Sequence, residues 1–523
     1  MQILFANQGG TAGIFIDSSL ADVVYSVEDF FMPFQIYKLI FGGIMIYPNL
    51  EQARELQFKS IPISLTLDVS IETVTLYKKL RNISKNVFVL ESCEDMQNFG
   101  RYSFLGFDPS LEVTAKDSTV TIKNDITITQ ENTSPHAIIR TILEQYKGPK
   151  LEKLPPFTGG LVGYFSYDFA KYSIPKLKLD AHDDEGFNDV DLMLFTKVIA
   201  IDNVDKKIII MNTIKTDNLE TNYNKALLEL DNIKNVLISG KQIVEEKGKL
   251  LSPLKETFSK SAFCAMVEKA KKYIVEGDIF QVVLSNRLSA DYTGSLIDIY
   301  KKLRKKNPSP YMFYFSSDDV EIAGASPETL VKVVDSTVMT YPLAGTKPRG
   351  KTADEDIQLE KELLADEKER AEHNMLVDLG RNDVGRIAEF GSVKVQEYMK
   401  VLRFSTVMHI GSTVEGKVRD DKDALDVVDA ILPAGTLSGA PKIRAMEIIN
   451  ELENEKRGIY GGAIGYLDFS GNIDTCIAIR LAFKKNNKIF VRSGAGIVMD
   501  SIPENEYEEC INKAKSVVNV LED

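Results

Sequence analysis

The sequence predicts an α+β fold in which hairpin-forming strands and separate helices follow one another irregularly along the chain. Turn-punctuated segments with the pattern of hairpin strands occupy 102–107, 111–115 and 118–129. Helical periodicity is found in two longer stretches, near 67–85 and 218–238. Beyond residue 260, strand-like and helix-like stretches alternate without a fixed order, and no short internal repeat is found.

The first half of the chain contains further strand signals. VFVLE at 87–91 predicts a strand, and the glycines of PPFTGGLVGYFSYDFA at 155–170 indicate a close backbone approach before a strand or a helix start. The run VDLMLFTKVIAIDNVDKKIIIMN, residues 190–212, is typical of two strands around an Asn/Asp turn. The stretch 239–260 is the best linker candidate. We therefore predict an unassigned N-terminal extension and two domains, 1–44, 45–240 and 255–520.

Two acidic helices are expected in the second half. The first, 366–383 (DEKERAEHNMLVDLGRND), places Glu369 and Glu372 on one face, above an apolar stripe that continues toward the interior. In the second, Pro503 suits a first helical turn after a Gly-Ala-Gly turn at 494–496. There Glu506, Glu509 and Lys513 follow at i, i+3 and i+7.

Composition excludes several classes of protein. A formal charge of −13 on 523 residues argues against nucleic acid as a partner, and no apolar run approaches the roughly 18 residues of a membrane span. The four cysteines lie far apart without CxxC or CxxH spacing, which disfavours a structural zinc site and a disulfide framework. We expect a soluble protein of the reducing cytoplasm.

The acidic helices suggest a metal site. Two Glu pairs without a nearby Cys or well-spaced His offer hard oxygen ligands, which favours Mg²⁺ over zinc or copper. The alternative is a solvated helix face that forms salt bridges with Lys368 and Arg370, because helical Glu pairs are common.

Longer motifs carry a family resemblance. They include GDIFQVVLSNRL, NPSPYMFYF, GASPETLVKV, YPLAGTKPRG, VMHIGSTVEG, LPAGTLSGAPKIRAMEII, RGIYGGAIGYLDFSGNIDTCIAIR and GAGIVMDSIPENEYEE, and VLESCEDMQNFGRYSFLGFDP extends the likeness into the first half. The last ~270 residues resemble the chorismate-utilising enzymes, and within them most closely the anthranilate synthase component I family. The resemblance implies a large sandwich of two packed antiparallel sheets surrounded by helices.

The resemblance also assigns residue roles. Mg²⁺ is expected on Glu372 and Glu509, with Glu369 and Glu506 holding metal-bound water. It implies that a carboxylate of chorismate is held by Tyr460, Arg480, Lys513 and the N–H groups of Gly494, Ala495 and Gly496.

Three catalytic residues follow from the same resemblance. Glu328 corresponds to a general acid for the departing 4-hydroxyl, His409 to a residue that organises the elimination of pyruvate, and Thr436 to a substrate hydrogen-bond donor. Each also has a plain structural interpretation. Glu328 could be a helix-start carboxylate after Pro327, His409 a core histidine, and Thr436 part of a helix-starting loop.

Two further positions separate reactions within this family. Members that add water to chorismate carry Lys where this chain has Gln281, and many aminodeoxychorismate synthases carry Lys where it has Ala344. The resemblance therefore implies direct addition of ammonia and formation of anthranilate. Aminodeoxychorismate synthase is the alternative enzyme. A sensor that binds chorismate or tryptophan without turnover is the alternative from another class.

The resemblance implies feedback inhibition and a partner. L-tryptophan is expected to bind at Leu90, Glu91, Ser92, Pro310, Tyr311, Met312 and Cys476. No cysteine has the Gly-rich setting of a glutaminase nucleophile, so ammonia is expected from a separate glutamine amidotransferase subunit within a heterotetramer.

Overall fold

The computed structural model describes residues 3–8, 11–16, 45–93, 100–403 and 407–522. The chain divides into two units, Met1–Ile46 and Tyr47–Asp523. In the first unit, β1 (Ile3–Gln8) pairs with β2 (Thr11–Ile16) in an antiparallel hairpin. The remainder of the predicted extension 1–44 lies outside the described residues. The strand β3 (Met45–Tyr47) crosses the division between the units.

Two large antiparallel sheets form the second unit. The first sheet runs in the order β14 (Lys249–Leu250), β16 (Gln281–Thr293), β28 (Lys488–Ile497), β27 (Leu481–Lys485), β18 (Val320–Ser326), β17 (Tyr311–Ser316), β5 (Val87–Glu91), β6 (Tyr102–Phe107), β12 (Lys197–Asp202), β13 (Lys207–Lys215) and β4 (Ser60–Leu67). Two short strands also pair with β16: β15 (Lys255–Glu256) and β24 (Gly439–Ala440).

The second sheet runs in the order β21 (Leu343–Pro348), β23 (Val407–Lys417), β20 (Thr337–Thr340), β19 (Thr329–Val334), β26 (Ile473–Ile477), β25 (Ala463–Asp468), β10 (Gly160–Phe165), β11 (Val190–Phe195), β7 (Leu111–Lys116), β8 (Thr119–Lys123) and β9 (Thr127–Gln130). A further strand, β22 (Lys394–Arg403), pairs with β23. The predicted α+β fold with two antiparallel sheets is confirmed.

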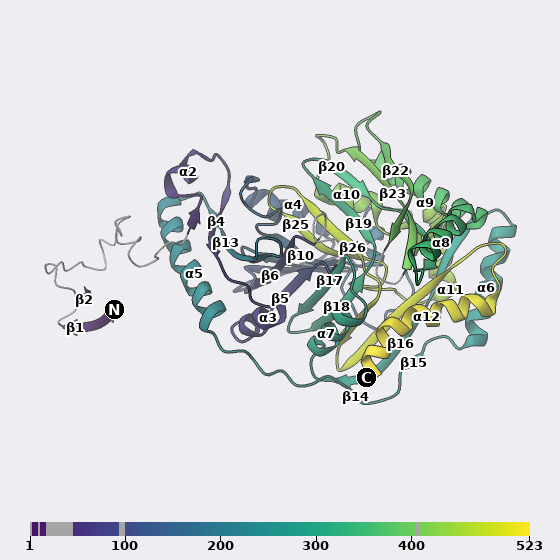
Figure 1. The fold of residues 1–523 in the computed structure, drawn as a ribbon, viewed down its shortest axis with the longest axis horizontal. Coiled ribbons are helices and arrows are strands. Elements are labelled where there is room, and N and C mark those ends of the chain that lie inside the picture. Colours follow the sequence, from purple (N-terminus) through teal and green to yellow (C-terminus); the bar gives the residue numbers. More distant parts are fainter. Residues whose placement is uncertain (1–2, 9–10, 17–44, 94–99, 404–406, 523) are drawn as a thin grey trace. The chain divides into compact units, whose positions relative to one another are not determined.

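Helices surround the sheets (Figure 1). Those of the first half are α2 (Leu50–Glu55), α3 (Thr73–Arg81), α4 (Pro135–Gln145), η2 (Tyr167–Tyr172) and α5 (Leu219–Ser239). Those of the second half are α6 (Lys260–Val275), α7 (Ile297–Lys306), α8 (Ala353–Ala365), α9 (Glu367–Gly385), α10 (Ala424–Ile431), η3 (Gly435–Leu437), α11 (Lys442–Glu453) and α12 (Pro503–Glu522). None of the helices within the described ranges is both long enough and apolar enough to span a bilayer.

Both predicted domains, 45–240 and 255–520, lie within the second unit apart from the first residues at 45–46. Each sheet combines strands from both, since β5 pairs with β17 in the first sheet and β10 pairs with β25 in the second. The predicted linker, 239–260, contains two short strands that pair with β16. The boundary therefore interrupts neither sheet.

The two sheets pack face to face through a shared aromatic core. From the first sheet it receives Phe88 and Phe104, and from the second Phe195 and Tyr466, all buried. Because successive strand residues face opposite sides, Val162 of β10 points into this core while Leu161 and Phe165 point the other way. The glycine-rich run at 155–170 is thus a strand that is buried on both faces.

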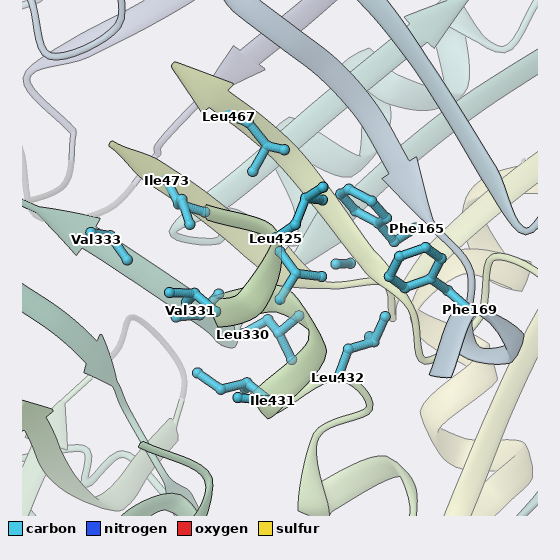
Figure 2. Close-up of a cluster of buried hydrophobic side chains, with 14 of the residues drawn as sticks. Phe165, Phe169, Leu330, Val331, Val333, Leu425, Ile431, Leu432, Leu467 and Ile473 are labelled. Carbon is cyan, nitrogen blue, oxygen red and sulfur yellow. The ribbon is translucent and has the colours of Figure 1, made fainter. Parts of the chain in front are cut away.

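A second core lies on the other face of the second sheet. Figure 2 shows Leu425 and Ile431 of α10 packed with Leu330 of β19, Leu467 of β25 and Phe165 of β10. The side chain of the N-cap residue Asp423 accepts from the backbone N–H groups of Leu425 and Asp426, and the Asp426 carboxylate accepts from the Asp423 N–H in return, so α10 begins at a fixed point above this sheet. This packing also fixes the loop that follows α10, which carries Thr436.

One element prediction is wrong. The run 190–212, expected to form two strands, forms three, because β11 belongs to the second sheet whereas β12 and β13 belong to the first. A single residue, Thr196, separates β11 from β12. No Gly, Pro or turn sequence marks this crossing between sheets, so the local pattern could not reveal it.

The aromatic core yields a stability prediction. Phe157 is fully buried and its ring stacks on Tyr466 at a centroid distance of 4.2 Å. Phe157→Ala should lower the free energy of unfolding by about 3–5 kcal/mol, because it leaves a cavity between the sheets. Urea denaturation measures the loss, with the fully exposed Phe390→Ala as the control. Equal effects of the two changes would contradict this role.

Candidate active site

Two neighbouring crossings between the sheets place the central residues. Between β18 and β19 the chain passes from the first sheet to the second through Pro327 and Glu328, and between β26 and β27 it returns through 478–480. The strands on either side are paired, β18 with β27 and β19 with β26. Two backbone hydrogen bonds join the crossings, Ile477 N–H to the Glu328 carbonyl (3.0 Å) and Ala325 N–H to the Arg480 carbonyl (3.1 Å).

These crossings line a cavity of about 840 Å³. Its walls come from β16, β21, β23, β28, α9, α12 and the η3 loop. All but one of the residues predicted for catalysis, substrate and metal line it, namely Gln281, Glu328, Glu369, Glu372, His409, Thr436, Tyr460, Arg480, Gly494, Gly496, Glu506, Glu509 and Lys513. Ala344, which distinguishes reactions within the family, lines it as well.

Glu328 is placed as a proton donor. Its Oε1 accepts a hydrogen bond from Thr436 Oγ1 at 3.1 Å. Burial raises the pKa of its carboxyl to about 7, although the Thr436 hydroxyl and the charge of Lys513 both lower it. The carboxyl therefore retains a proton near neutrality, as a general acid must. Glu328 lies in the crossing itself, so the alternative of a helix-start carboxylate does not apply.

Arg480 is a buried cation held in a left-handed backbone conformation, with φ of +54°. A non-glycine residue pays about 1–2 kcal/mol for that conformation, and such residues cluster at functional sites. Its Nη1 donates to the Ser516 hydroxyl at 3.3 Å, and no carboxylate of the described residues lies within ion-pair distance. Burial lowers the pKa of this guanidinium, an effect that Tyr460 opposes. Among the described residues, the Arg480 guanidinium in the cavity wall thus has no carboxylate partner and can bind an anionic ligand.

His409 is held as a neutral imidazole. Its Nδ1 lies 2.7 Å from the Gly345 carbonyl oxygen, so Nδ1–H donates and Nε2 carries the lone pair. Burial lowers the pKa of the imidazole, and the charge of Arg480 lowers it further. Sequence analysis singled out Ala344 in this loop but not Gly345. The carbonyl that sets the tautomer of His409 belongs to the backbone, so the residue type at position 345 could not indicate it.

The expected Gly-Ala-Gly turn is part of strand β28. Its residues alternate, so Gly494 and Gly496 face the cavity whereas Ala495 is fully buried in the core beneath. A Cβ on Gly494 would lie 2.6 Å from the Leu284 carbonyl and 3.0 Å from the Tyr460 hydroxyl, which explains the glycine. The structure therefore brings Gly494 and Gly496 to the site, but not the side chain of Ala495.

The two glycines also expose backbone groups. Opposite them on β16, the N–H groups of Val283 and Ser285 point away from β28, toward the Ser438 carbonyl and the Glu453 carboxylate. By antiparallel alternation, the N–H groups of Gly494 and Gly496 then point away from β16, and that of Ala495 points toward it. Beyond Val491 the neighbouring strand β27 has ended. These two N–H groups can therefore bind an anion.

Four carboxylates form an acidic wall of the cavity. Burial raises the pKa of Glu369, Glu372 and Glu506, and the charge of Glu509 raises all three further. Glu509 Oε1 forms an ion pair with Lys513 Nζ at 2.7 Å. An all-oxygen set with unbalanced negative charge fits a hard divalent cation. Within the described residues no three such side chains converge tightly enough to hold a metal, so binding would require them to rotate.

A second, smaller cavity of about 250 Å³ lies between the sheets. All seven residues predicted for tryptophan line it, namely Leu90, Glu91, Ser92, Pro310, Tyr311, Met312 and Cys476. The structure adds Arg101, Lys332 and Asp474, which sequence reasoning missed because each lies outside the LES and NPSPYM motifs. Tyr311 donates to Asp474 Oδ1 at 2.8 Å.

Comparisons with known proteins agree with this geometry. The family described as chorismate binding enzyme matches residues 85–519. Anthranilate synthase component 1 of Acetivibrio thermocellus is 43% identical, covering 92% of this chain and 99% of the relative, and that of Aquifex aeolicus is 43% identical, covering 91% and 97%. The crystal structure of anthranilate synthase component I from Streptococcus pneumoniae aligns with a TM-score of 0.69 at 39% identity, covering 80% of this chain and 92% of that chain.

A more distant structure shares the fold alone. The menaquinone-specific isochorismate synthase from Escherichia coli aligns with a TM-score of 0.66 at 19% identity and covers 90% of this chain and 98% of that chain. Its reaction carries no argument for this chain at that identity.

The raised pKa of Glu328 makes stability depend on pH. The folded protein binds this proton more tightly than the unfolded chain, whose carboxyl has its ordinary pKa of 4.5, so stability is lost as pH rises from about 4.5 through about 7. Glu328→Gln should therefore stabilise the protein at pH 8, by on the order of 1–3 kcal/mol, and much less at pH 5. Urea denaturation at both values measures this.

The exposed Glu268→Gln is the matched control and should change stability equally little at both pH values. An effect of Glu328→Gln that does not differ between pH 5 and pH 8 would show that the folded protein does not hold this proton.

Proposed function

The chain belongs to the chorismate-binding enzyme family, and from this premise we propose that it is anthranilate synthase component 1, which converts chorismate and ammonia to anthranilate and pyruvate. The observation that carries the proposal is the pair of joined crossings. They hold a protonated carboxyl, Glu328, beside a buried cation without a carboxylate partner, Arg480. Chorismate presents the complementary groups, a hydroxyl that must leave and two carboxylates.

Arg480, Tyr460 and the N–H groups of Gly494 and Gly496 would bind one carboxylate of chorismate. The Mg²⁺ that we propose on Glu372 and Glu509, with Glu369 and Glu506 beside them, would supply positive charge for the other carboxylate. Both carboxylates are thereby balanced within a chain whose net charge is −13.

The first step is an amination. The nitrogen of ammonia bonds to C2, both ring double bonds shift by one position, and the C4–O bond breaks as Glu328 gives its proton to the hydroxyl, which leaves as water. A proton lost from the new ammonium group can restore Glu328. Thr436 holds the Glu328 oxygen in place during this exchange. The product of this step is 2-amino-2-deoxyisochorismate.

The second step is an elimination. The bond between the ring and the enolpyruvyl oxygen breaks, the C2 proton is lost, and the enolpyruvyl methylene is protonated to give pyruvate. Loss of the C2 proton makes the ring aromatic. Burial lowers the pKa of His409 and so favours its neutral form, and the Gly345 carbonyl sets the tautomer, so that Nε2 would present its lone pair to this step.

The nucleophile is ammonia because the two reaction-specific positions offer no amine. Gln281 and Ala344 both line the cavity. The Oε1 atom of Gln281 is buried and has no hydrogen-bond partner in the described part of the chain, so it can accept an N–H bond from ammonia. The cavity amine of Lys513 is engaged with Glu509 and with the Gly494 carbonyl.

Ammonia would come from a separate glutamine amidotransferase subunit, with the two components assembled as a heterotetramer. No cysteine of the described residues forms a disulfide, and none lines the larger cavity. Thiols that remain reduced suit the cytoplasm, which is the compartment that we propose.

We propose L-tryptophan as an inhibitor that binds the smaller cavity. An amino acid needs acidic, basic and apolar groups together, and Asp474, Lys332 and Tyr466 all line this cavity. Among the described residues the two cavities share no lining residue. They are linked by Tyr311, whose hydroxyl lies 3.0 Å from that of Thr329, the residue after Glu328. Displacement of Tyr311 would therefore disturb the general acid.

The product tests the function. Purified protein with chorismate, Mg²⁺ and ammonium at alkaline pH should release equal amounts of anthranilate and pyruvate without an added subunit, and EDTA should stop it. Glutamine should support turnover only with the partner subunit. Glu328→Gln should abolish activity, whereas the exposed Glu268→Gln should retain it. His409→Ala should accumulate 2-amino-2-deoxyisochorismate.

Other products identify the alternatives. Formation of 4-amino-4-deoxychorismate would contradict the role assigned to Ala344, and isochorismate would contradict that of Gln281. Binding of chorismate or tryptophan without any turnover would favour the sensor.

Inhibition is tested at Ser92. Ser92→Leu places a larger apolar side chain in the wall of the smaller cavity and should raise the tryptophan concentration needed for half inhibition by about tenfold or more. The kcat without tryptophan should stay within about twofold, because Ser92 does not line the larger cavity. Inhibition curves for parent and variant measure both quantities. An unchanged curve would remove Ser92 from the inhibitor site.

A further inference from the structure

One buried guanidinium lies behind the candidate active site. Arg457 is 1% exposed, the largest side chain among those fully buried in the described residues. Its Nε and Nη2 donate to the Glu453 carboxylate at 3.0 and 2.5 Å, and its plane lies over the ring of Tyr167, 4.7 Å from the centroid. The remaining contacts of Arg457 are directed at the walls of the cavity.

Two backbone carbonyls of these walls receive hydrogen bonds from Arg457. Its Nη1 donates to the Leu437 carbonyl and its Nη2 to the Val283 carbonyl, each at 2.6 Å. Leu437 directly follows Thr436, the donor to Glu328, and both Leu437 and Val283 line the cavity. One side chain therefore ties the η3 loop to the start of β16.

The carboxylate partner extends this connection. Glu453, at the end of α11, is itself 2% exposed and accepts from the Ser285 backbone N–H at 2.7 Å and from the Ser285 hydroxyl at 3.1 Å. The Arg457–Glu453 pair thus joins α11, β16 and the η3 loop. Arg457 itself lies three residues before Tyr460 in the sequence. No alternative conformation of one segment is possible without loss of a bond to another.

Only arginine can make this set of contacts. The guanidinium donates in a fixed plane to two carbonyls and one carboxylate, whereas a lysine ammonium has three donors on a flexible stem. A buried ion pair contributes little net stability but fixes geometry when every donor is satisfied. This set of contacts therefore fixes the positions of the segments at Leu437 and Val283 in the cavity wall.

We propose that Arg457 is a positioning residue of the reaction, which holds Thr436, and through it the proton-donating oxygen of Glu328, at the place where the hydroxyl leaves. This inference rests on the proposed function. Displacement of reacting groups by about 1 Å can cost up to 100-fold in rate, so loss of this contact should affect turnover more than substrate binding.

Arg457→Lys is the test, with Arg287→Lys as the matched control. Arg287 is a buried arginine of β16, ion-paired with Glu185 at 3.0 Å and Glu455 at 3.3 Å, and it does not line the cavity. Both changes should lower the midpoint of urea unfolding. Only Arg457→Lys should lower kcat, by about tenfold or more, with KM for chorismate changed less than about threefold.

The second readout is coupling to Thr436. Thr436→Val removes the hydroxyl that lowers the pKa of Glu328, so the alkaline limb of kcat/KM, measured at constant free NH₃, should move to higher pH. Arg457→Lys should move this limb in the same direction. The double variant should be no slower than about the slower single variant, because both changes disturb one contact.

Three results would overturn the inference. They are parental kcat in folded Arg457→Lys, a rise in KM alone, and fully additive losses with Thr436→Val. If Arg457→Lys does not fold, Ser285→Ala replaces it, since it weakens the hold on Glu453, and an unshifted alkaline limb then overturns the inference. If the parental protein turns over chorismate and any one of these results is obtained, only the inference is rejected. Parental protein without turnover rejects the proposed function and the inference with it.

Discussion

The site depends on two chain crossings that cannot move apart. Each sheet pairs the strands on its side of the crossings, and two backbone hydrogen bonds join the crossings themselves. Glu328 and Arg480 belong to these short connections, so their separation is set by the strand spacing of two packed sheets. This constraint also accounts for the left-handed conformation of Arg480, which the surrounding strands impose on a connection of only three residues.

Charge burial follows from the same arrangement. The crossings line the larger cavity, where the solvation of an ion is reduced, so burial raises the pKa of Glu328 and lowers that of Arg480. Reduced solvation is unfavourable for the charged forms of Glu328 and Arg480, and it occurs where the proposed reaction needs a proton donor and a group that binds an anion. By contrast, the buried charges of Arg457 and Glu453 are paired with each other.

Strands at the smaller cavity lead directly to the crossings at the larger one, although the two cavities share no lining residue among the described residues. β26 carries Asp474 and Cys476 at the smaller cavity and ends at the crossing that carries Arg480. Tyr311 reaches Thr329, which follows Glu328 on β19. The inhibitor that we propose would act on these crossings if it displaced β26 or Tyr311, through the same contacts that position them.

The sequence by itself determined the local elements and the inventory of chemical groups. The strands 87–91 and 102–107, the helix near 218–238 and the acidic helices follow from periodicity, caps and turns, which are local interactions. Motif resemblance identified the residues that now line the two cavities. Only the tertiary structure decided which sheet each strand joins, as at Thr196, and that Gly494–Gly496 forms a strand rather than a turn. Strand partners, the tautomer of His409 and the bonds of Arg457 depend on residues distant in sequence, and no local pattern encodes those contacts.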